Sequence, residues 1–420
     1  MRVLWLTFTV FPEAMSLYSG ETVHRGSGGW LFSSATELRK QSDEIELCVA
    51  TVANCFYKFR KLRGEEILYY AIPSGSGFDE YHHGYDNYWK IINDEFKPDV
   101  VHVHGVESSI GLSYIRVNGN KNVVCSFQGL PNIIARYLMH GLTLKEMLKN
   151  TTIRDIVRFN TYLSLVKLNA QKDTMVKDMM LECDNFIGRT EWDKTHLWAV
   201  NPKAKYFFCN ETLRPIFYNN IWQYEKCRPH TIFISAMKGL HIFLNALPII
   251  VRQYPDTQVL VATGGNLIND DIRSKLRMTG FEHMIRNRMR KFKIEKYIHF
   301  LGPLNEEQMV NHYLQANVFV SPSTCENSSN SVCEAQLLGV PLVASYVGGM
   351  ADLIPNDSCG VMYRCEEFEM LAKNVCNIFE NSSFDNSEMR NVALKRHDAI
   401  INAKRTIDIY TTIINTSNKI

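Results

Sequence analysis

Short runs of β-branched and other apolar residues recur along the chain, and most end at a glycine or polar residue before a segment with helical periodicity. This alternation predicts βαβ units built around a parallel sheet. The sequence therefore predicts an α/β protein. The expected strands are Val3 to Phe8, Ile45 to Thr51, Val100 to His104, Val123 to Phe127, Phe186 to Gly188, Thr231 to Ile234, Gln258 to Ala262, Ile298 to Leu301, Val318 to Ser321 and Leu342 to Ser345.

The predicted strands fall into two groups, one in each half of the chain, and each group is large enough for its own doubly wound sheet. The segment from Asn210 to Tyr218 lies between the groups and carries Pro215, so we expect the joint there. Two such domains facing each other would form a central cleft. Because open parallel sheets bind ligands beyond the carboxyl ends of their strands, the residues that follow each strand are the first candidates for a site.

The composition is typical of a globular protein, with 45% hydrophobic and 21% charged residues among 420, which excludes extensive disorder. The formal charge of +2 argues against nucleic acid as a partner. Two stretches differ from this balance: Ile133 to Met180 holds eight basic and four acidic residues, and Asp271 to Lys296 holds nine and three. Each could meet anionic lipid or form a solvated helix face.

Cysteine usage and the lack of long apolar runs favour a cytoplasmic protein. The eleven cysteines include no Cys-x-x-Cys pair, which indicates a reduced compartment. No apolar run approaches the roughly 18 residues that span a bilayer. The apolar start from Met1 to Phe11 is followed by Pro12 and Glu13, so we interpret it as a buried strand and not a signal peptide. Peripheral contact with the inner face of the membrane, made by the basic stretches, is an alternative.

The segment from Asn317 to Leu353 carries the strongest functional signal. It predicts a strand ending at Ser321, a polar loop, and a helix that begins near Asn330 and ends before Gly339. Unpaired amides at the start of a helix favour an anion, so the sequence predicts a phosphate site there. Its amides belong to Ser329, Asn330 and Ser331, and Glu326 and Glu334 bracket the loop and first turn.

Further motifs make this signal specific. The two glutamates are separated by seven residues and followed by Ala335, Gly339-Val340-Pro341 and Val347-Gly348-Gly349. Together they resemble the donor-binding core of glycosyltransferase family 4, whose members are retaining enzymes of the GT-B fold. Other stretches agree along nearly the whole chain: Gly28-Gly29-Trp30, Pro98 to Gly105, Lys238-Gly239 and Phe300-Leu301-Gly302.

The resemblance implies a fold and two domain roles. It implies two Rossmann-like, doubly wound domains facing a cleft. Residues 1–212 with 398–420 would form the acceptor-binding domain, and residues 213–397 would bind the nucleotide-sugar donor. The last helix, around Asp398 to Ile414, would return to the first domain.

The resemblance also implies residue roles. Glu326 would lie against the donor sugar, and Glu334 would hold the ribose hydroxyls. Lys238 would stabilise the charge of the leaving diphosphate, so Glu326 and Lys238 are the expected catalytic residues. Gly348 and Gly349 would let the backbone approach the donor closely. On the acceptor and diphosphate side the expected residues are Gly28, Gly29, His104 and Gln128.

The chain departs from the family pattern in two places. The arginine that usually precedes the Lys-Gly pair by about five residues is missing, and Arg189, after a predicted strand, is our candidate for the second diphosphate cation. Where many members have a histidine, this chain has Gln128. Glutamine can hydrogen-bond a sugar hydroxyl but cannot relay a proton, so transfer on the front face of the sugar is favoured.

The sequence thus predicts a retaining transferase that moves a hexosyl group from a nucleotide diphosphate sugar, expected to be UDP-linked, to a saccharide or lipid-linked saccharide. No cofactor and no metal is expected. His102 and His104 share one strand face at a metal-ligand spacing, but no third ligand cluster accompanies them. Two rival functions remain: a nucleotide-sugar epimerase, or a catalytically weak sugar-binding subunit.

Overall fold

A computed structural model of the protein describes residues 1–23, 29–74, 83–263, 265–269, 271–381 and 384–418. Every predicted strand is present, with bounds within two residues of those expected, and the α/β class is confirmed. The chain divides into two compact units. The first contains Met1–Asn132, Ala170–Arg214 and His397–Ile420, and the second contains Ile133–Asn169 and Pro215–Arg396.

The first unit is built on one sheet with the strand order β3-β4-β2-β1-β5-β6-β7-β8. Every pairing is parallel except that of β3 with β4. The strands are β1 Arg2–Thr7, β2 Glu46–Ala53, β3 Arg60–Arg63, β4 Ile67–Pro73, β5 Val100–His104, β6 Val123–Ser126, β7 Asn185–Gly188 and β8 Lys205–Phe208.

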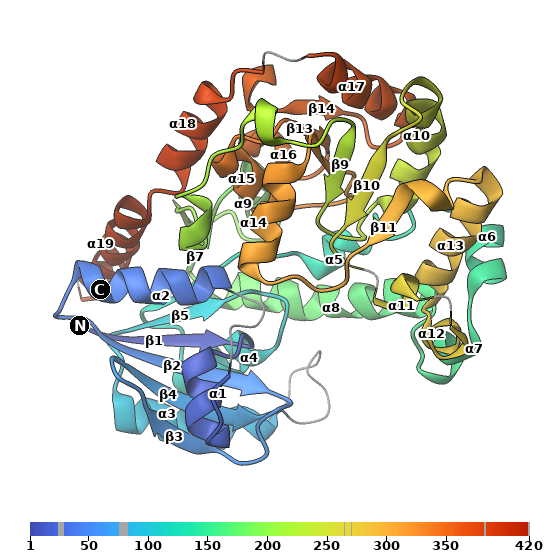
Figure 1. Ribbon diagram of the computed structural model, residues 1–420. Coiled ribbons are helices and arrows are strands. Elements are labelled where there is room, and N and C mark those ends of the chain that lie inside the picture. Colours follow the sequence, from blue (N-terminus) through green and yellow to red (C-terminus); the bar gives the residue numbers. More distant parts are fainter. Residues whose placement is uncertain (24–28, 75–82, 264, 270, 382–383, 419–420) are drawn as a thin grey trace. The chain divides into compact units, whose positions relative to one another are not determined.

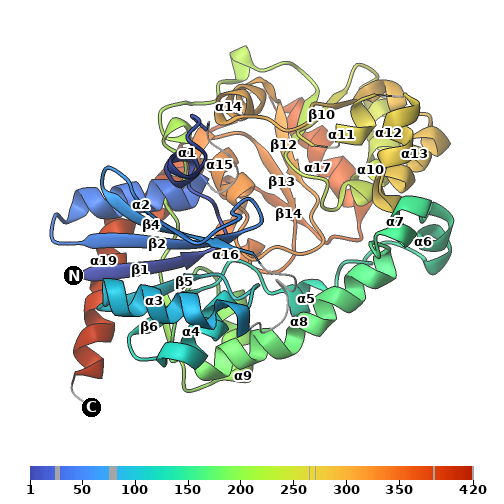
Figure 2. The same cartoon turned by 90° about the horizontal axis from the view of Figure 1, so that it is seen from below.

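Helices cover both faces of this sheet, with α2 and α19 on one face and α3 and α4 on the other (Figures 1 and 2). Buried residues of α2 and α19, among them Leu31 and Tyr410, pack on Val3 and Trp5 of β1. The last helix, which we expected to return to the first domain, therefore belongs to this unit. The helices are α1 Pro12–Ser19, α2 Gly29–Gln41, α3 Asp86–Phe96, α4 Ile110–Asn118, α9 Glu191–Val200 and α19 Ala399–Ser417.

The second unit has a fully parallel sheet in the order β11-β10-β9-β12-β13-β14. Its core lies between this sheet and helices that include α10 and α17 (Figure 1). The strands are β9 Thr231–Ile234, β10 Gln258–Val261, β11 Ile298–Phe300, β12 Val318–Ser321, β13 Leu342–Ser345 and β14 Val361–Tyr363. The helices are α10 Leu240–Gln253, α11 Gly265–Ile268, α12 Ile272–Arg277, α13 Gly280–Phe292, α14 Glu306–Gln315, α15 Asn330–Leu338, α16 Met350–Leu353, α17 Phe368–Glu380 and α18 Ser387–Arg396.

Residues 133–169 differ from the sequence interpretation, which placed them in the first domain. They contribute the second half of α5 Pro131–Ile134, all of α6 Leu144–Asn150 and α7 Ile153–Val157, and the start of α8 Tyr162–Glu182. Charged side chains bind this segment to α13: Glu146 pairs with Arg288 at 2.6 Å, and Asp155 accepts a hydrogen bond of 2.7 Å from the Gly280 amide. These contacts, distant in sequence, place the segment in the second unit.

No helix within the described ranges is long and apolar enough to cross a membrane. All eleven cysteines are free thiols.

Candidate active site

Three loops of the second unit meet where β9, β12 and β13 end. Gly239 has a φ of +70°, and a Cβ there would lie 1.6 Å from the Pro322 carbonyl oxygen. Gly348 has a φ of +53°, and a Cβ there would lie 1.8 Å from the carbonyl oxygen of Glu326. Only glycine tolerates both the backbone conformation and the contact at these two positions. The Lys238-Gly239 and Gly348-Gly349 motifs are therefore both packed against the loop that carries Glu326.

An ion pair spans two of these loops. The Lys238 ammonium lies 3.2 Å from Glu326 Oε1, and the Ser323 hydroxyl donates to the same oxygen at 2.8 Å. The Lys238 side chain is 61% exposed, whereas that of Glu326 is 14% exposed. The structure thus brings together the two residues predicted to be catalytic. The ammonium is accessible to a ligand while the carboxylate is held in place.

Helix α15 follows this loop as predicted, from Asn330 to Leu338, with Gly339 in the left-handed conformation at its end. The side chain of Ser329, at the N-cap, makes no capping hydrogen bond to the first-turn amides and instead contacts the Ser331 hydroxyl at 3.1 Å. Glu334 lies one turn into the helix and is only 6% exposed. The two glutamates therefore occupy different settings, one on a loop beside a cation and one within a helix.

The loop also contains Cys325, whose thiol is not suited to nucleophilic chemistry. Burial raises the pKa of Cys325 to about 12, with a further contribution from the nearby Glu326 charge. The thiol therefore stays protonated at neutral pH and is a weak nucleophile.

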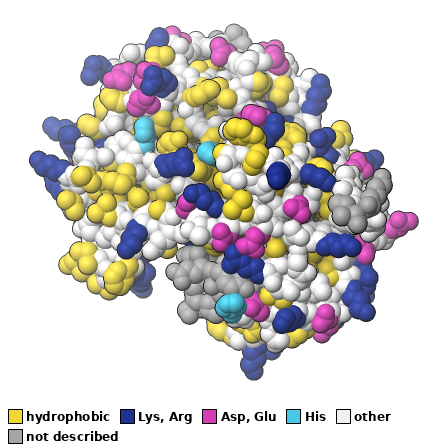
Figure 3. Space-filling view, turned by 180° about the vertical axis from the view of Figure 1, so that it is seen from behind, with side chains coloured by type: hydrophobic (Ala, Val, Ile, Leu, Met, Phe, Trp, Pro, Cys, Tyr) yellow, Lys and Arg dark blue, Asp and Glu magenta, His cyan; other side chains and the backbone are white. Residues whose placement is uncertain are grey.

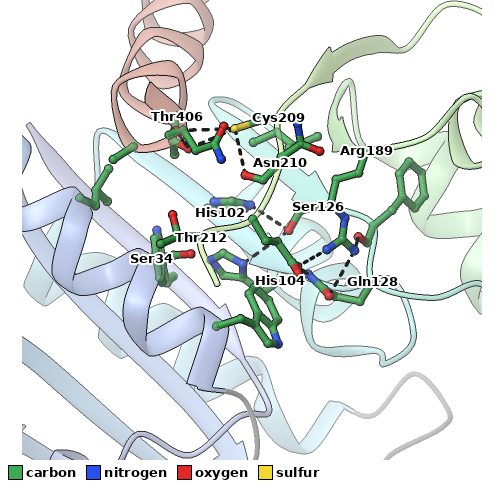
Figure 4. Close-up of a pocket in the computed structure, with 18 residues that line it drawn as sticks. Ser34, His102, His104, Ser126, Gln128, Arg189, Cys209, Asn210, Thr212 and Thr406 are labelled. Carbon is green, nitrogen blue, oxygen red and sulfur yellow. Dashed lines mark hydrogen bonds and ion pairs between the residues drawn. The ribbon is translucent and has the colours of Figure 1, made fainter. Parts of the chain in front are cut away.

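The first unit contains a cavity of about 60 Å³ at the carboxyl ends of its central strands, and its wall is mostly apolar with a few polar and charged side chains. Figure 4 shows His104, Gln128 and Arg189 converging on it from the ends of β5, β6 and β7. Trp5 and Trp30 form part of its apolar wall. A mixture of aromatic faces and hydrogen-bonding groups is typical of sites that bind hydroxylated ligands.

Arg189 has other partners than the diphosphate for which we proposed it. Its guanidinium is buried, forms an ion pair with Glu211, and donates to the Phe127 carbonyl oxygen at 2.7 Å. Gln128 donates to the same carboxylate at 3.0 Å. Glu211 compensates the charge of Arg189, so the structure assigns the arginine to the frame of this cavity.

His102 and His104 are neutral. Their rings pack with centroids 3.9 Å apart, and burial lowers the pKa of His102 to about 3 and holds that of His104 well below its usual range. His102 is bonded on both ring nitrogens, to the Tyr410 hydroxyl at 2.6 Å and the Ser126 hydroxyl at 3.0 Å. His104 Nε2 is buried and has no partner within the described residues. Only His104 can offer a ring nitrogen to a ligand.

Two acidic residues of this region were missed by sequence reasoning. Glu211 follows β8, an edge strand that we did not predict, and its Oε2 is buried without a partner in the described part of the chain. Glu107 follows β5 by three residues, and burial raises the pKa of its carboxyl group to about 7. The rule that residues after strands line sites would have selected both, had β8 been predicted and the loop after His104 been followed further.

The glycine loop expected on the acceptor side is only partly described. Gly28 lies outside the described residues. Gly29 is the first residue of α2, and a Cβ there would lie 3.0 Å from the Arg214 side chain. Within the described ranges no group of three His, Cys, Asp or Glu side chains is arranged to hold a metal ion.

Known proteins resemble part of this chain in sequence and nearly all of it in fold. Residues 228–381 match the family described as glycosyl transferases group 1. The phosphatidylinositol N-acetylglucosaminyltransferase GPI3 subunit of Saccharomyces cerevisiae is 23% identical over 183 residues, which cover 43% of this chain and 37% of that protein. The D-inositol 3-phosphate glycosyltransferase of Corynebacterium urealyticum is 26% identical over 129 residues, which cover 31% and 29%. The aligned parts therefore span less than half of these relatives.

Solved structures match over nearly the full length. Sucrose-phosphate synthase from Thermosynechococcus elongatus has a TM-score of 0.70 at 15% identity, covering 99% of this chain and all of that one. Anabaena HepE in complex with UDP-glucose has a TM-score of 0.60 at 13% identity, covering 98% and 100%. At such identities the likeness concerns the fold. The chain therefore has the GT-B fold of glycosyltransferases and carries the glycosyl transferases group 1 domain in residues 228–381.

Proposed function

We propose that this chain is a retaining glycosyltransferase that moves a hexosyl group from a UDP-sugar to a hydroxyl group of a saccharide or lipid-linked saccharide. The observation that carries the proposal is the accessible Lys238 ammonium paired with the held Glu326 carboxylate, at loops packed together by Gly239 and Gly348. The family match over residues 228–381 covers all of these positions.

The second unit supplies the donor roles. The diphosphate lies against the amides at the start of α15, where the helix dipole favours an anion. Lys238 exchanges Glu326 for the diphosphate when the donor binds, and Glu326 then faces the sugar. Glu334 accepts hydrogen bonds from the ribose hydroxyls, and these are strong because the acceptor is charged.

The transfer step follows from these roles. The bond between the anomeric carbon and the diphosphate oxygen breaks, and the acceptor oxygen bonds to the same face of that carbon. The acceptor proton passes to the leaving phosphate oxygen, so no protein base is needed. Lys238 stabilises the negative charge that develops on the diphosphate, and this charge is larger in the transition state than in the bound donor.

We propose that the cavity of the first unit binds the acceptor. His104 Nε2 and Glu211 Oε2 are buried without partners in the described structure, and both can bind a hydroxyl group. Gln128 is fixed by Glu211 and can contribute a hydrogen bond but no proton relay. A carboxylate oxygen beside a neutral histidine and tryptophan rings favours a sugar or another polyol over an anionic acceptor group.

The names of two relatives refer to compounds of the same chemical class. One name refers to phosphatidylinositol and the other to D-inositol 3-phosphate, which both contain a polyhydroxylated ring. The aligned residues cover too little of these proteins to carry the acceptor across. The acceptor class therefore rests on the cavity.

The experiment that tests the proposal is a thermal-shift panel of UDP, GDP, ADP and their hexose conjugates, followed by product analysis. A donor at about 100 times its dissociation constant should stabilise the fold by about 2.7 kcal/mol. NMR of the product formed with a saccharide acceptor should show the anomeric configuration of the donor. Epimerisation of the UDP-sugar without acceptor would establish the epimerase instead. Nucleotide-sugar binding with no hydrolysis and no transfer would establish a sugar-binding subunit.

A further inference from the structure

Helices α6 and α7 turn unusually apolar side chains toward solvent. Leu148 is 69% exposed, Ile153 82%, Val157 71% and Phe159 84%. Isolated exposed apolar residues are common, but a contiguous group on consecutive short helices marks an interaction surface. We call this surface, together with the exposed residues Ile272 and Leu276 of α12 and the neighbouring lysines and arginines, the apolar-basic face.

Helix α12 continues the same face. The hydroxyl of Thr152, at the start of α7, donates to the carbonyl oxygen of Met278, at the end of α12, at 3.4 Å. Ile272 and Leu276 of α12 are 77% and 74% exposed. Figures 1 and 2 show α6, α7 and α12 close together at one end of the second unit. Figure 3 shows hydrophobic and basic side chains side by side at this end.

The segment is held firmly from its inner side, so the exposed apolar residues do not result from loose packing. Met147 of α6 is buried, and capping boxes at Thr143 and Thr152 start α6 and α7. Both acidic residues of the segment are used for this attachment, Glu146 in its pair with Arg288 and Asp155 in its bond to the Gly280 amide. Fixed inner contacts thus set which residues face outward.

Phe159 is a second, independent indication that this surface has a partner. It follows α7 with a φ of +50°, in the left-handed region where a helix normally ends in glycine or asparagine. A bulky residue there strains the backbone. Because the ring is 84% exposed, packing within the protein does not explain its presence. Strain retained for an exposed aromatic side chain indicates a partner outside the fold.

The charges around these residues are mostly positive. Residues 141–168 and 271–277 together hold eight basic and three acidic residues, in a chain whose net charge is only +2. The exposed basic residues include Lys145, Lys149 and Arg158 beside the apolar ones, and Arg273, Lys275 and Arg277 on α12. Two of the three acids are those used for attachment, and the third, Asp271, caps α12.

We infer that the apolar-basic face docks the protein onto a bilayer that contains anionic phospholipid. The apolar side chains enter the boundary between headgroups and acyl chains, and the surrounding lysines and arginines contact lipid phosphates. This combination fits a lipid surface better than a second copy of the chain, because two copies of a strongly basic face repel each other. The inference goes beyond the proposed transfer and does not depend on it.

Vesicle co-sedimentation without any donor or acceptor tests the inference. The protein should bind phosphatidylcholine vesicles that contain phosphatidylglycerol, bind pure phosphatidylcholine vesicles far less, and dissociate as salt is raised. Each of Lys145→Gln, Lys149→Gln and Arg158→Gln should weaken binding about fivefold, the equivalent of about 1 kcal/mol per basic residue. Lys226→Gln, an exposed lysine elsewhere in the second unit, is the matched control.

The apolar residues allow a sharper test. Phe159→Gly relieves the left-handed strain, so it should leave the protein equally or more stable while weakening vesicle binding about tenfold. Ile153→Ser should act on binding in the same direction, and Ile221→Ser, 54% exposed outside the face, should not. Failure of the wild type to bind anionic vesicles, or equal binding by Phe159→Gly and Ile221→Ser, would overturn the inference. Sedimentation equilibrium that shows a dimer abolished by Ile153→Ser would also overturn it, by making the face an interface between copies.

Discussion

Two ion pairs of similar chemistry occupy opposite settings in this molecule. In the first unit Arg189 and Glu211 are both buried, with 6% and 9% of their side chains exposed. In the second unit Lys238 is 61% exposed beside a largely buried Glu326. A buried cation that loses its partner is left uncompensated, whereas an exposed ammonium can exchange a carboxylate for another anion at little cost. The difference indicates that the first pair shapes a cavity and the second is available to a ligand.

The largest expected effect concerns the buried pair. Arg189→Met leaves the Glu211 carboxylate buried without compensation and should lower the free energy of unfolding of the first unit by about 3–5 kcal/mol. The double variant Arg189→Met, Glu211→Leu should recover most of this loss, because no charge remains buried. Urea unfolding curves measure the free energy of unfolding of both variants. If the single and double variants lose equal free energy of unfolding, the uncompensated charge of Glu211 is not the cause of the loss.

The exposed pair should behave in the opposite way. Lys238→Ala should change stability by less than about 1 kcal/mol but lower kcat by roughly 10² to 10³, since the lost charge acts on the transition state. Lys238→Arg should recover only part of kcat, because a planar guanidinium does not reproduce a compact point charge. Steady-state kinetics with Lys226→Ala as control measures this. A kcat for Lys238→Ala within a few-fold of wild type would show that the leaving group depends on another cation.

The same contrast explains how much the sequence could predict. The strands that precede Lys238, Glu326 and Gly348 were predicted to the residue, because each has a continuous apolar run, whereas the three residues themselves were selected by the resemblance of their motifs to the family. Gly239 and Gly348 then bring the loops together through contacts that only glycine permits. Local signals are sufficient where each element carries its own start and end.

The cavity of the first unit could not be predicted in this way. Arg189 follows a strand that we predicted, but Glu211 follows β8, which lacks a buried pattern, so the sequence did not indicate that the two residues pair. β3 and β8 are edge strands with exposed charged or polar positions, so they lack the buried pattern, and β14 has only three residues. We also did not predict β4, although its run from Ile67 to Ile72 carries the buried pattern and could have been recognised. Residues 133–169 were assigned to the first domain because their contacts with α13 are likewise distant in sequence.

Glu107 allows a pH test confined to the first unit. Burial raises the pKa of this carboxyl group from 4.5 to about 7, so between these values the native protein keeps a proton that the unfolded chain releases. Stability therefore falls as pH rises from about 4.5 to about 7, by about 3 kcal/mol at most. Glu107→Gln should remove this fall, making the variant more stable than wild type at pH 8 and no more stable near pH 4.

The buried histidines also change stability with pH, so the effect of Glu107 is measured as the difference in unfolding free energy between wild type and Glu107→Gln. Because His102 and His104 have lowered pKa values, they stabilise the native state increasingly as pH rises toward 6.5, opposite to Glu107. Their contribution is common to wild type and Glu107→Gln and cancels in the comparison. Unfolding curves measured at several pH values give the difference directly. A difference that does not vary with pH would mean that Glu107 is ionised in the native state.

The smallest expected effect separates the two glutamates of the second unit. Glu334→Gln should weaken binding of UDP by about tenfold, since a hydrogen bond to a charged acceptor contributes about 1.5–3 kcal/mol and glutamine replaces only part of it. Glu326→Ala should leave UDP affinity unchanged or slightly higher, because it frees the Lys238 ammonium from its partner, while turnover falls. Isothermal titration calorimetry with UDP measures both, with Glu307→Ala as an exposed control on α14. Equal losses of UDP affinity in the two variants would mean that both carboxylates serve the nucleotide. The ion pair seen in the structure would then belong to nucleotide binding and not to the sugar end of the site.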